Sequence, residues 1–383
     1  MRRFVAMALC LALLLVPAKA TAAELEVGGK SGILMDIATG KILFEQNSHE
    51  KLAPASVTKV MTMLLIMEAV DSGALSWGDL VTASEAAAAK GGSQVYLKVG
   101  ETMTVEEMLK SIAVSSANDC ACAMAEHIAG SEGAFVEKMN ARAAELGMAD
   151  THFVNCTGLD DSQEAAEHRT SAHDIALMSR ELMLRHPDIQ KFTTIWMDTV
   201  RGGAFGLSNT NKMIRFYPGA TGLKTGFTSG AMYCLSATAE RDGLGLIAVV
   251  MGAETSQKRF AACKSMLDYG FANYALIQPE LESGPAEVPV VLGREETVSA
   301  RLGEASPILV DKSQRGSVTM QAQLEPTVAA PVSRGQRLGT LTVCSGDQVL
   351  AEIPLVAAQE VAKRTWGDVF TEVLRRAAMA KKC

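Results

Sequence analysis

The feature that most constrains the fold is a long apolar segment near the start of the chain. Residues 60–70 contain only two polar side chains, Thr62 and Glu68. A helix with so little polar surface must be enclosed by other elements on nearly all sides. Just before it stand a serine and a lysine three residues apart, Ser56 and Lys59. Burying a lysine there is costly unless it has partners or a chemical role.

The order of the patterns predicts one α+β domain. The stretch "SGILMDIATGKILFEQN" alternates like two strands about a turn at residues 38–41. "TGLKTGFT", "YCLSATA" and "LGLIAVVMG" read as strands much later in the chain. Strands first, helices in the middle and strands last indicate an antiparallel sheet built from both chain ends and flanked by helices. Helical patterns cover residues 104–114, 118–128, 131–146, 170–185 and 256–274.

The composition shifts after about residue 278. Proline, glycine, valine and threonine dominate residues 278–356, which predicts a small all-β domain. The tail, residues 359–383, has apolar side chains at helical spacing and carries six basic and three acidic residues. Such a basic amphipathic helix suits an anionic membrane surface. The alternative is a helix packed on its own domain; the tail is too short and too charged to span a bilayer.

The first residues have the form of a secretory signal. Arg2 and Arg3 precede a short apolar run, and small residues offer cleavage after Ala20 or Ala23. A retained membrane helix is the alternative, but the run is too short to span comfortably. We therefore expect a signal at 1–23, a first domain at 24–277, a β-rich domain at 278–357 and an amphipathic helix at 358–383. The protein would then be extracytoplasmic and attached peripherally to the outer face of the membrane.

Charge and cysteine content exclude several classes of function. Removing residues 1–20 leaves 33 basic against 43 acidic residues, so a nucleic-acid-binding surface is not expected. Seven cysteines then remain, an odd and scattered set that does not form a disulfide framework, although one disulfide stays possible. "CAC" at residues 120–122 has no matching second pair, and the six histidines show no metal spacing, so no metal site is expected.

Ser56 and Lys59 form a compact nucleophile and base. A serine hydroxyl is a poor nucleophile at neutral pH and needs an adjacent base. A lysine can act as that base when burial or a second cation disfavours its charged form. The motif alone is weak, because Ser48 and Lys51 repeat it in a polar loop. The plain alternative is a helix-capping serine and a lysine that reaches the surface.

Two further motifs strengthen the chemical interpretation. Ser116 and Asn118 place a hydroxyl and an amide two residues apart, and Lys224-Thr225-Gly226 lies on a predicted strand. The hydroxyl can pass a proton to a leaving amine, and the amide can orient Lys59 or the substrate. The strand can hold an anionic substrate at its edge, and Gly226 permits close approach. Taken alone, the first motif is typical of a turn with a helix cap, and the second is typical of a lysine on an edge strand.

Together these motifs resemble those of class A β-lactamases and penicillin-binding proteins. Residues 31–274 look like the low-molecular-mass penicillin-binding proteins, the D-alanyl-D-alanine carboxypeptidases, and the C-terminal segments resemble that family's β-rich domain and membrane anchor. The strings that carry the resemblance are "PASVTKVMT", "SANDC", "AEHIAGSEGAFVEKMNARAAELGM", "THFVN", "HRTSAHDIALMSREL" and "TGLKTGFTSGAMYCLSATAERDG".

The resemblance implies a role for each site residue. Ser56 would attack the carbonyl between the last two D-alanines of a peptidoglycan stem peptide, and Lys59 would take its proton. Backbone N–H groups of Ser56 and Phe227 would form the oxyanion hole. β-Lactams would acylate the same serine, and no metal or organic cofactor is implied. The remaining site residues would be Ser116, which returns a proton to the leaving amine, Asn118, which positions Lys59 and the substrate amide, Lys224, Thr225 and Arg259, which bind near the terminal carboxylate, and Gly226, which lets the substrate approach closely.

Three other functions compete with this interpretation. A serine β-lactamase shares the three motifs, but class A enzymes add a Glu-x-x-x-Asn loop before Lys-Thr-Gly, which this chain lacks. A non-catalytic penicillin-binding cell-wall protein would keep the site for binding alone. A Ser-His-Asp hydrolase is disfavoured, because no serine lies in Gly-x-Ser-x-Gly. Carboxypeptidase and endopeptidase preference, and the diamino acid of the stem, stay open.

Overall fold

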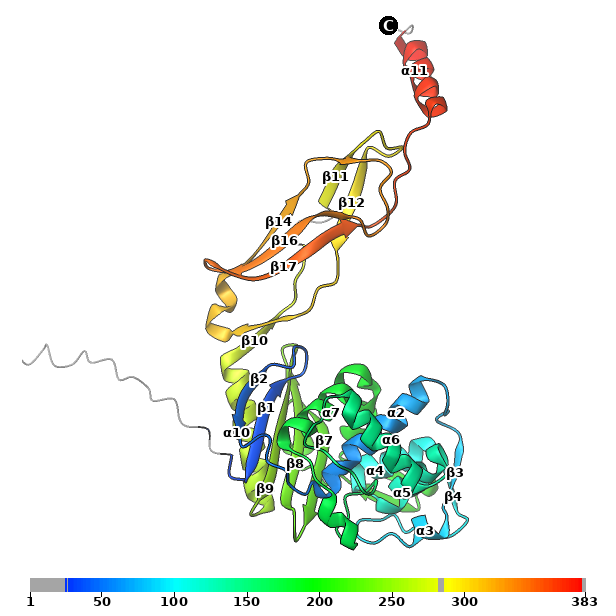
Figure 1. Ribbon diagram of the computed structural model, residues 1–383, viewed down its shortest axis with the longest axis vertical. Coiled ribbons are helices and arrows are strands. Elements are labelled where there is room, and N and C mark those ends of the chain that lie inside the picture. Colours follow the sequence, from blue (N-terminus) through cyan, green and yellow to red (C-terminus); the bar gives the residue numbers. More distant parts are fainter. Residues whose placement is uncertain (1–24, 26, 282–285, 381–383) are drawn as a thin grey trace, which may run out of the picture.

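The protein consists of a mixed first domain, a β-rich second domain and a terminal helix, which follow one another along the long axis of the molecule (Figure 1). The computed structural model describes residue 25 and residues 27–281 and 286–380. The predicted α+β class with a following β-rich domain is confirmed. The predicted secretory signal, residues 1–23, lies outside the described residues.

The first domain is built on a five-stranded antiparallel sheet of order β2-β1-β9-β8-β7. Its first two strands come from the start of the domain and its last three from the end, as the sequence predicts. β1 lies between β2 and β9, so the two ends of the domain are hydrogen-bonded to each other. The strands are β1 (Ser31–Asp36), β2 (Ile42–Gln46), β7 (Ala220–Thr228), β8 (Met232–Arg241) and β9 (Leu244–Ala253).

Side-chain alternation along β1 explains how the sheet separates two cores. Ile33 and Met35 point into the large helical core, whereas Leu34 joins the core beneath α10 (Ser256–Asn273) on the other face. The helical side contains α2 (Lys59–Asp71), α4 (Val105–Ser115), α5 (Asn118–Ala129), α6 (Glu132–Glu145) and α7 (Ala172–Arg185). Shorter elements complete it: α3 (Glu85–Ala88), α8 (Gln190–Thr193), β3 (Leu80–Thr82) paired with β4 (Thr102–Thr104), and β5 (Met197–Val200) paired with β6 (Phe205–Ser208). α9 (Met213–Phe216) instead contributes Met213 to the core beneath α10.

α2 is the apolar helix that the sequence places at the centre of the domain. Its residues from Lys59 to Leu64 are all buried, including Thr62, whose hydroxyl donates to the Cys156 carbonyl at 2.7 Å. A single 3₁₀ turn, η1 (Ala55–Thr58), leads into it. The other 3₁₀ turns are η2 (Gln163–Glu167), η3 (Pro187–Ile189), η4 (Arg201–Gly203) and η5 (Lys312–Ser317).

The second domain has its own sheet and its own core. The six strands have the order β14-β16-β17-β12-β11-β15, and buried residues such as Val298, Leu338 and Leu355 fill the interior. β10 (Tyr274–Ile277) and β13 (Ile308–Asp311) pair at the junction. The remaining strands are β11 (Ala286–Val291), β12 (Thr297–Leu302), β14 (Val318–Leu324), β15 (Val328–Ala329), β16 (Arg337–Ser345) and β17 (Gln348–Ala357).

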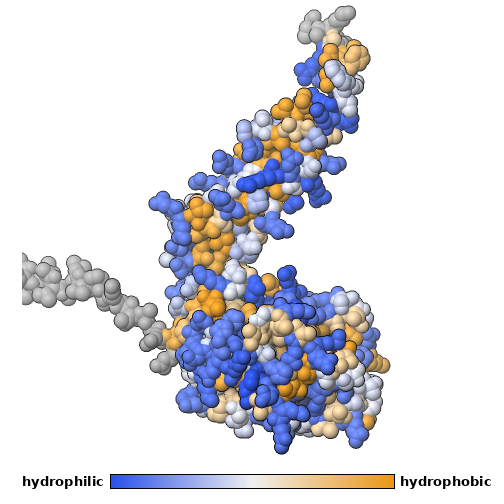
Figure 2. All heavy atoms as spheres, viewed as in Figure 1, coloured by the Kyte–Doolittle hydropathy of each residue, from blue (hydrophilic) through white to orange (hydrophobic). Residues whose placement is uncertain are grey.

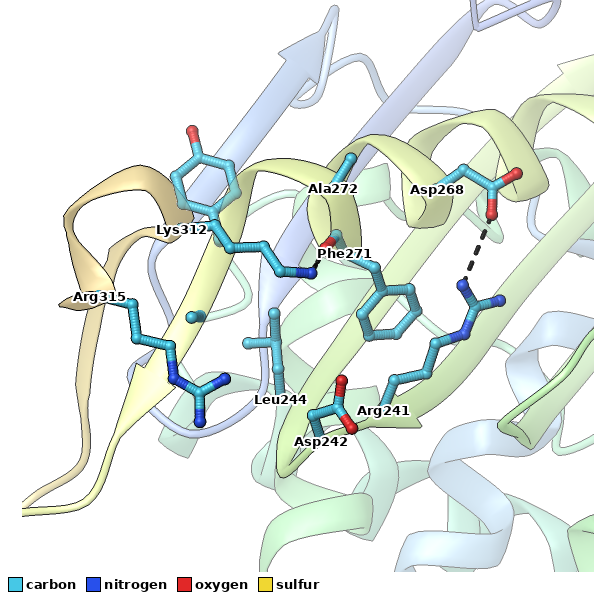
Figure 3. A pocket seen from close by; sticks show the side chains of 10 residues that line it. Arg241, Asp242, Leu244, Asp268, Phe271, Ala272, Lys312 and Arg315 are labelled. Carbon is cyan, nitrogen blue, oxygen red and sulfur yellow. Dashed lines mark hydrogen bonds and ion pairs between the residues drawn. The ribbon is translucent and has the colours of Figure 1, made fainter.

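Charged side chains from both domains line a cavity of about 280 Å³ at the junction (Figure 3). Lys312 of η5 donates its Nζ to the Phe271 carbonyl at the end of α10, at 2.9 Å. The Arg241 guanidinium lies 4.5 Å from the centre of the Phe271 ring and forms a long ion pair, 3.8 Å, with Asp268. The Lys312 hydrogen bond and the β10–β13 pairing join the two domains, whereas the Arg241 contacts order the first-domain side of the cavity.

The terminal helix begins later than its sequence pattern suggests. α11 covers Trp366–Ala380, whereas the helical pattern begins near residue 359. Val361 is instead buried in the core of the second domain and pairs with Val332, which holds this stretch extended. The Thr365 hydroxyl accepts the Asp368 N–H, and Asp368 accepts the Thr365 N–H, so a reciprocal cap sets the start of the helix.

The cysteines of the described chain are free thiols. Five of the six are buried and Cys344 is partly exposed. They behave as small apolar side chains, so the disulfide left open by the sequence does not form among them.

Candidate active site

The Ser56 hydroxyl and the Lys59 ammonium meet at the entrance to α2. Ser56 lies in η1 and Lys59 is the first residue of α2. Lys59 Nζ donates to Ser56 Oγ at 3.0 Å, and Lys59 is completely buried while Ser56 is partly exposed. Ala55 has a φ of +48°, a left-handed conformation that turns the chain sharply just before the serine. The local geometry thus exposes the hydroxyl and hides its base.

Burial makes Lys59 a base near neutral pH. Removal of the ammonium from water lowers the pKa of Lys59 to about 7, and nearby Cys156 and Asp119 offset this only in part. Lys59 Nζ also donates to the Thr157 carbonyl at 2.9 Å. That second acceptor directs the nitrogen toward the serine and leaves its lone pair available when the proton is absent.

Ser116 and Asn118 lie where two helices of the first domain meet. Ser116 ends α4 in a left-handed conformation, with a φ of +64°, and Asn118 starts α5. Asn118 Nδ2 donates to the Gly91 carbonyl at 2.7 Å, and its Oδ1 is buried without a partner among the described residues. Among the described residues no hydrogen bond joins Asn118 to Lys59, so the expected contact between these two side chains is not seen. The unpartnered oxygen is instead available to a substrate N–H.

β7 brings a second buried lysine to the site. Lys224 Nζ donates to the Thr225 carbonyl at 2.8 Å. Burial, together with the charges of Lys59 and Arg259, holds the pKa of Lys224 well below its ordinary value. The Thr225 hydroxyl donates to Thr210 Oγ1 at 2.7 Å. The site therefore brings together basic side chains whose charged forms a bound anion would favour.

Gly226 lets β7 pass directly against the serine turn. A Cβ atom at this position would lie 3.1 Å from the Ser56 nitrogen and 2.8 Å from the Pro54 carbonyl oxygen. The strand backbone and the start of η1 are therefore in close contact. Phe227 follows, with its side chain half exposed and its ring centre 4.3 Å from that of Tyr233.

Arg259 is a buried residue that braces β7 from the α10 side. Its Nη1 donates to the Gly226 carbonyl at 2.8 Å and to the Cys234 carbonyl at 3.1 Å. The side chain is 7% exposed, which excludes the alternative of a solvated helix residue. Its Nε is buried without a partner among the described residues, so the guanidinium retains a free donor.

Sequence reasoning missed the loop that supplies the second acceptor for Lys59. Asn155 Oδ1 accepts the N–H groups of Thr157 at 3.1 Å and of Gly158 at 2.6 Å, which folds the loop into a tight turn. Gly158 has a φ of +80°, and a Cβ there would lie 1.8 Å from the Ala55 carbonyl oxygen. The signal was the string "NCTG", in which an asparagine precedes a glycine turn.

A buried histidine links this loop to η1, the 3₁₀ turn that carries the serine. His168 Nδ1 accepts the Val154 N–H at 3.1 Å, so its Nε2 donates to Thr58 Oγ1 at 2.8 Å. Thr58 in turn donates to the Ala55 carbonyl. Burial lowers the pKa of His168 to about 4, which keeps the ring neutral and suits a structural role. Within the described chain no group of acidic, cysteine or histidine side chains is arranged to hold a metal ion.

Comparisons with known proteins agree with this arrangement. A family model described as D-alanyl-D-alanine carboxypeptidase matches residues 18–255, and one for the C-terminal domain of penicillin-binding protein 5 matches residues 281–363. The D-alanyl-D-alanine carboxypeptidase DacF of Bacillus subtilis is 44% identical over 359 residues, 90% of this chain and 91% of the relative.

Two solved structures extend the comparison to three dimensions. Penicillin-binding protein 5 of Haemophilus influenzae aligns with a TM-score of 0.71 and 28% identity, over 88% of this chain and 98% of the other. The ampicillin-bound form of penicillin-binding protein D2 of Listeria monocytogenes aligns with a TM-score of 0.59 and 32% identity. This alignment covers 65% of this chain and 99% of the Listeria chain.

Proposed function

The chain belongs to the D-alanyl-D-alanine carboxypeptidase family of serine hydrolases, and we propose that it removes the terminal D-alanine of peptidoglycan stem peptides through an acyl-enzyme on Ser56. The family membership predicted from the sequence motifs is confirmed. The observation that best supports the assignment of Ser56 is its 3.0 Å contact with a buried Lys59 whose pKa is about 7. A base with that pKa is partly unprotonated at neutral pH.

The first half-reaction forms the ester. Neutral Lys59 takes the Ser56 proton as the hydroxyl oxygen attacks the carbonyl carbon of the penultimate D-alanine. The N–H groups of Ser56 and Phe227, close together because of Gly226, stabilise the negative oxygen that develops. The C–N bond then breaks, and Ser116 relays a proton to the nitrogen of the departing D-alanine. Water later attacks the ester and releases the shortened peptide from Ser56.

The cations position the substrate by its terminal carboxylate. Lys224 and the Thr225 hydroxyl lie on the strand that the peptide would follow, and Arg259 has a free Nε behind it. The unpartnered Asn118 Oδ1 would accept an N–H of the peptide. A carboxylate in this site would accept hydrogen bonds from these side chains and would favour the charged forms of Lys224 and Arg259.

β-Lactams acylate the enzymes of this family, and the ampicillin-bound relative carries the corresponding fold. We propose that Ser56 is the acylated residue here. The intact hydrogen bond between Ser56 and Lys59 favours turnover over a purely binding role. A β-lactamase is disfavoured, because the two family models together extend over both domains of the chain.

The test is D-alanine release from a pentapeptide ending in D-Ala-D-Ala. The mature chain should release D-alanine, and Ser56→Ala should release none, since this variant lacks the hydroxyl that forms the ester. Ser48→Ala is the matched control, because Ser48 stands in the second Ser-x-x-Lys and donates to Glu45 instead. Loss of release in Ser48→Ala, or release by Ser56→Ala, would contradict the assignment.

We further propose that the chain is secreted and that α11 attaches it to an anionic membrane surface. Trp366, Phe370 and Leu374 are each more than half exposed on α11. Burying each such side chain contributes about 1.5–3 kcal/mol. Within the described residues, no helix is both long and apolar enough to cross a bilayer. A surface attachment is the arrangement that these properties favour.

Vesicle binding tests this attachment. The full mature chain should sediment with vesicles that contain phosphatidylglycerol, and the double variant Phe370→Ser/Leu374→Ser should bind at least about tenfold more weakly. Val349→Ser is the control, because Val349 is equally exposed but lies on β17. β-Lactam acylation of each variant verifies the folded state. Equal binding by the double variant and the parent chain would refute the proposal.

A further inference from the structure

A strained and exposed tyrosine lies three residues after Ser93, whose carbonyl accepts the Asn118 N–H. Tyr96 has a φ of +60°, a conformation that a bulky side chain rarely adopts, and its side chain is 68% exposed. Its ring therefore does not fill a core. Neither feature is explained by the reaction at Ser56, and strain of this kind persists only where the surroundings fix it.

A buried carboxylate fixes the backbone on both sides of Tyr96. Asp119 Oδ2 accepts the Val95 N–H at 3.1 Å and the Leu97 N–H at 3.0 Å, and Asp119 is completely buried. Val95 and Leu97 are themselves buried. The two flanking residues are therefore anchored, and Tyr96 is forced outward between them.

A second anchor joins this segment to the β5–β6 hairpin. Arg201 donates from Nη1 to the Val95 carbonyl at 2.7 Å and from Nε to Glu101 at 2.6 Å. The same guanidinium lies 5.4 Å from the centre of the Phe205 ring. The rings of Tyr96 and Phe205 are 6.3 Å apart in an edge-to-face arrangement. The result is an aromatic pair held in one geometry from both sides.

Both aromatic residues lie on chain segments that also contact residues of the catalytic site. Three residues before Tyr96, the Ser93 carbonyl accepts the Asn118 N–H at 2.7 Å. β6, which begins with Phe205, leads to Thr210, the hydrogen-bond partner of Thr225. The three-residue stretch from Ser93 to Tyr96 spans at most about 10 Å, whereas an extended stem peptide of five residues reaches about 17 Å. A group attached to the far end of the stem can therefore reach the tyrosine.

We propose that Tyr96 and Phe205 form a subsite for a sugar ring of the glycan strand that carries the stem peptide. This rests on the proposed function, and it names a part of the substrate beyond the scissile bond. The face of a sugar ring that presents C–H groups is apolar, and its rim is polar. An exposed aromatic body with a hydroxyl tip matches both properties. Fixing the ring in advance limits the entropy lost when the sugar binds.

The test compares two substrates with one scissile bond: the free pentapeptide and the same pentapeptide attached to its disaccharide. The readout is the ratio of kcat/KM for the second substrate to that for the first. Tyr96→Gly removes the ring and tolerates the left-handed backbone, so we expect this ratio to fall about tenfold, through KM. Tyr96→Phe keeps the ring and should keep most of the ratio.

Val99→Ala is the matched control, because Val99 is 66% exposed in the same segment without belonging to the aromatic pair. Its ratio should equal that of the parent chain. An unchanged ratio in Tyr96→Gly would overturn the subsite while leaving the proposed function intact. An equal loss on both substrates would show that Tyr96 acts only through the structure of the site. If the parent chain releases no D-alanine from either substrate, the proposed function itself fails.

Discussion

At the scale of single residues, the site is a cluster of buried basic side chains. Lys59 and Lys224 are almost completely buried, and the charge of Lys59 is one cause of the lowered pKa of Lys224. The unfolded chain holds both protons up to a pKa of about 10.4, whereas the folded chain releases the Lys59 proton near pH 7. Between these values the unfolded state binds more protons, so the contribution of Lys59 to stability rises with pH.

The pH dependence of acylation follows from the same shift. The second-order rate of acylation by a fluorescent penicillin should rise between pH 6 and 8 with a midpoint near 7, because only neutral Lys59 accepts the serine proton. Lys59→Arg should lower this rate by about 10²–10⁴-fold and remove the step near pH 7. A wild-type rate that stays flat from pH 6 to 8 would rule out Lys59 as the base.

Backbone strain is found at three residues in or near the site. Ala55, Ser116 and Tyr96 all have positive φ; Ala55 precedes the nucleophile, Ser116 carries the second hydroxyl, and Tyr96 lies between the two residues whose N–H groups Asp119 accepts. Each such conformation costs about 1–3 kcal/mol. The α2 helix and the Asp119 carboxylate supply the rigid surroundings that hold these residues in place.

At the scale of elements, the oxyanion hole depends on contact between one strand and one turn. β7 and η1 come from distant parts of the chain, and Gly226 is the point where their backbones meet. Any side chain there must push the strand away from Ser56. The Phe227 N–H would move with the strand, and the two donors would no longer converge.

Gly226→Ala should therefore slow β-lactam acylation by about 10²-fold, since a displacement of about 1 Å can cost that much. Gly133→Ala is the control, because a Cβ at this helical position in α6 meets no atom within 4 Å. The control should acylate at the parent rate and unfold at the same or a higher temperature. Parent-like acylation by Gly226→Ala would show that the strand and the turn are not coupled.

Periodicity predicted most elements, because alternation and helical spacing report which faces are buried. The sequence patterns predicted a sheet with strands from both ends of the domain, the enclosed helix α2 and the capped start of α4. It could not reveal the Thr157 carbonyl, since a backbone acceptor has no signature in the sequence. The burial of Arg259 behind β7 and the extended stretch around Val361 depend on tertiary packing, which local patterns do not contain.

At the scale of the whole molecule, the two domains have separate cores. The interior of the second domain shares no buried residue with those of the first. Contacts between the domains include the β10–β13 pairing, the packing of Leu309 against the core beneath α10, and the Lys312 hydrogen bond to Phe271. The space-filling view shows the second domain as a narrow body that extends from the larger first one (Figure 2). The site lies entirely in the first domain.

Calorimetry should therefore resolve two unfolding transitions. Acylation of Ser56 by a β-lactam should raise the temperature of the transition that belongs to the first domain, because the attached acyl group makes its non-covalent contacts with the site only in the folded state. The other transition should not move. A single transition, or equal movement of both, would show that the junction in Figure 3 couples the domains more strongly than its contacts suggest.

The buried lysines also determine what laboratory evolution would do to this protein. Keeping Lys59 unprotonated in the fold at pH 7 costs roughly 4 kcal/mol relative to the unfolded chain. An apolar side chain of similar length would escape that penalty. A library screened for heat resistance alone would thus enrich inactive variants at positions 59 and 224. Selection would have to include turnover in every round to retain the catalyst.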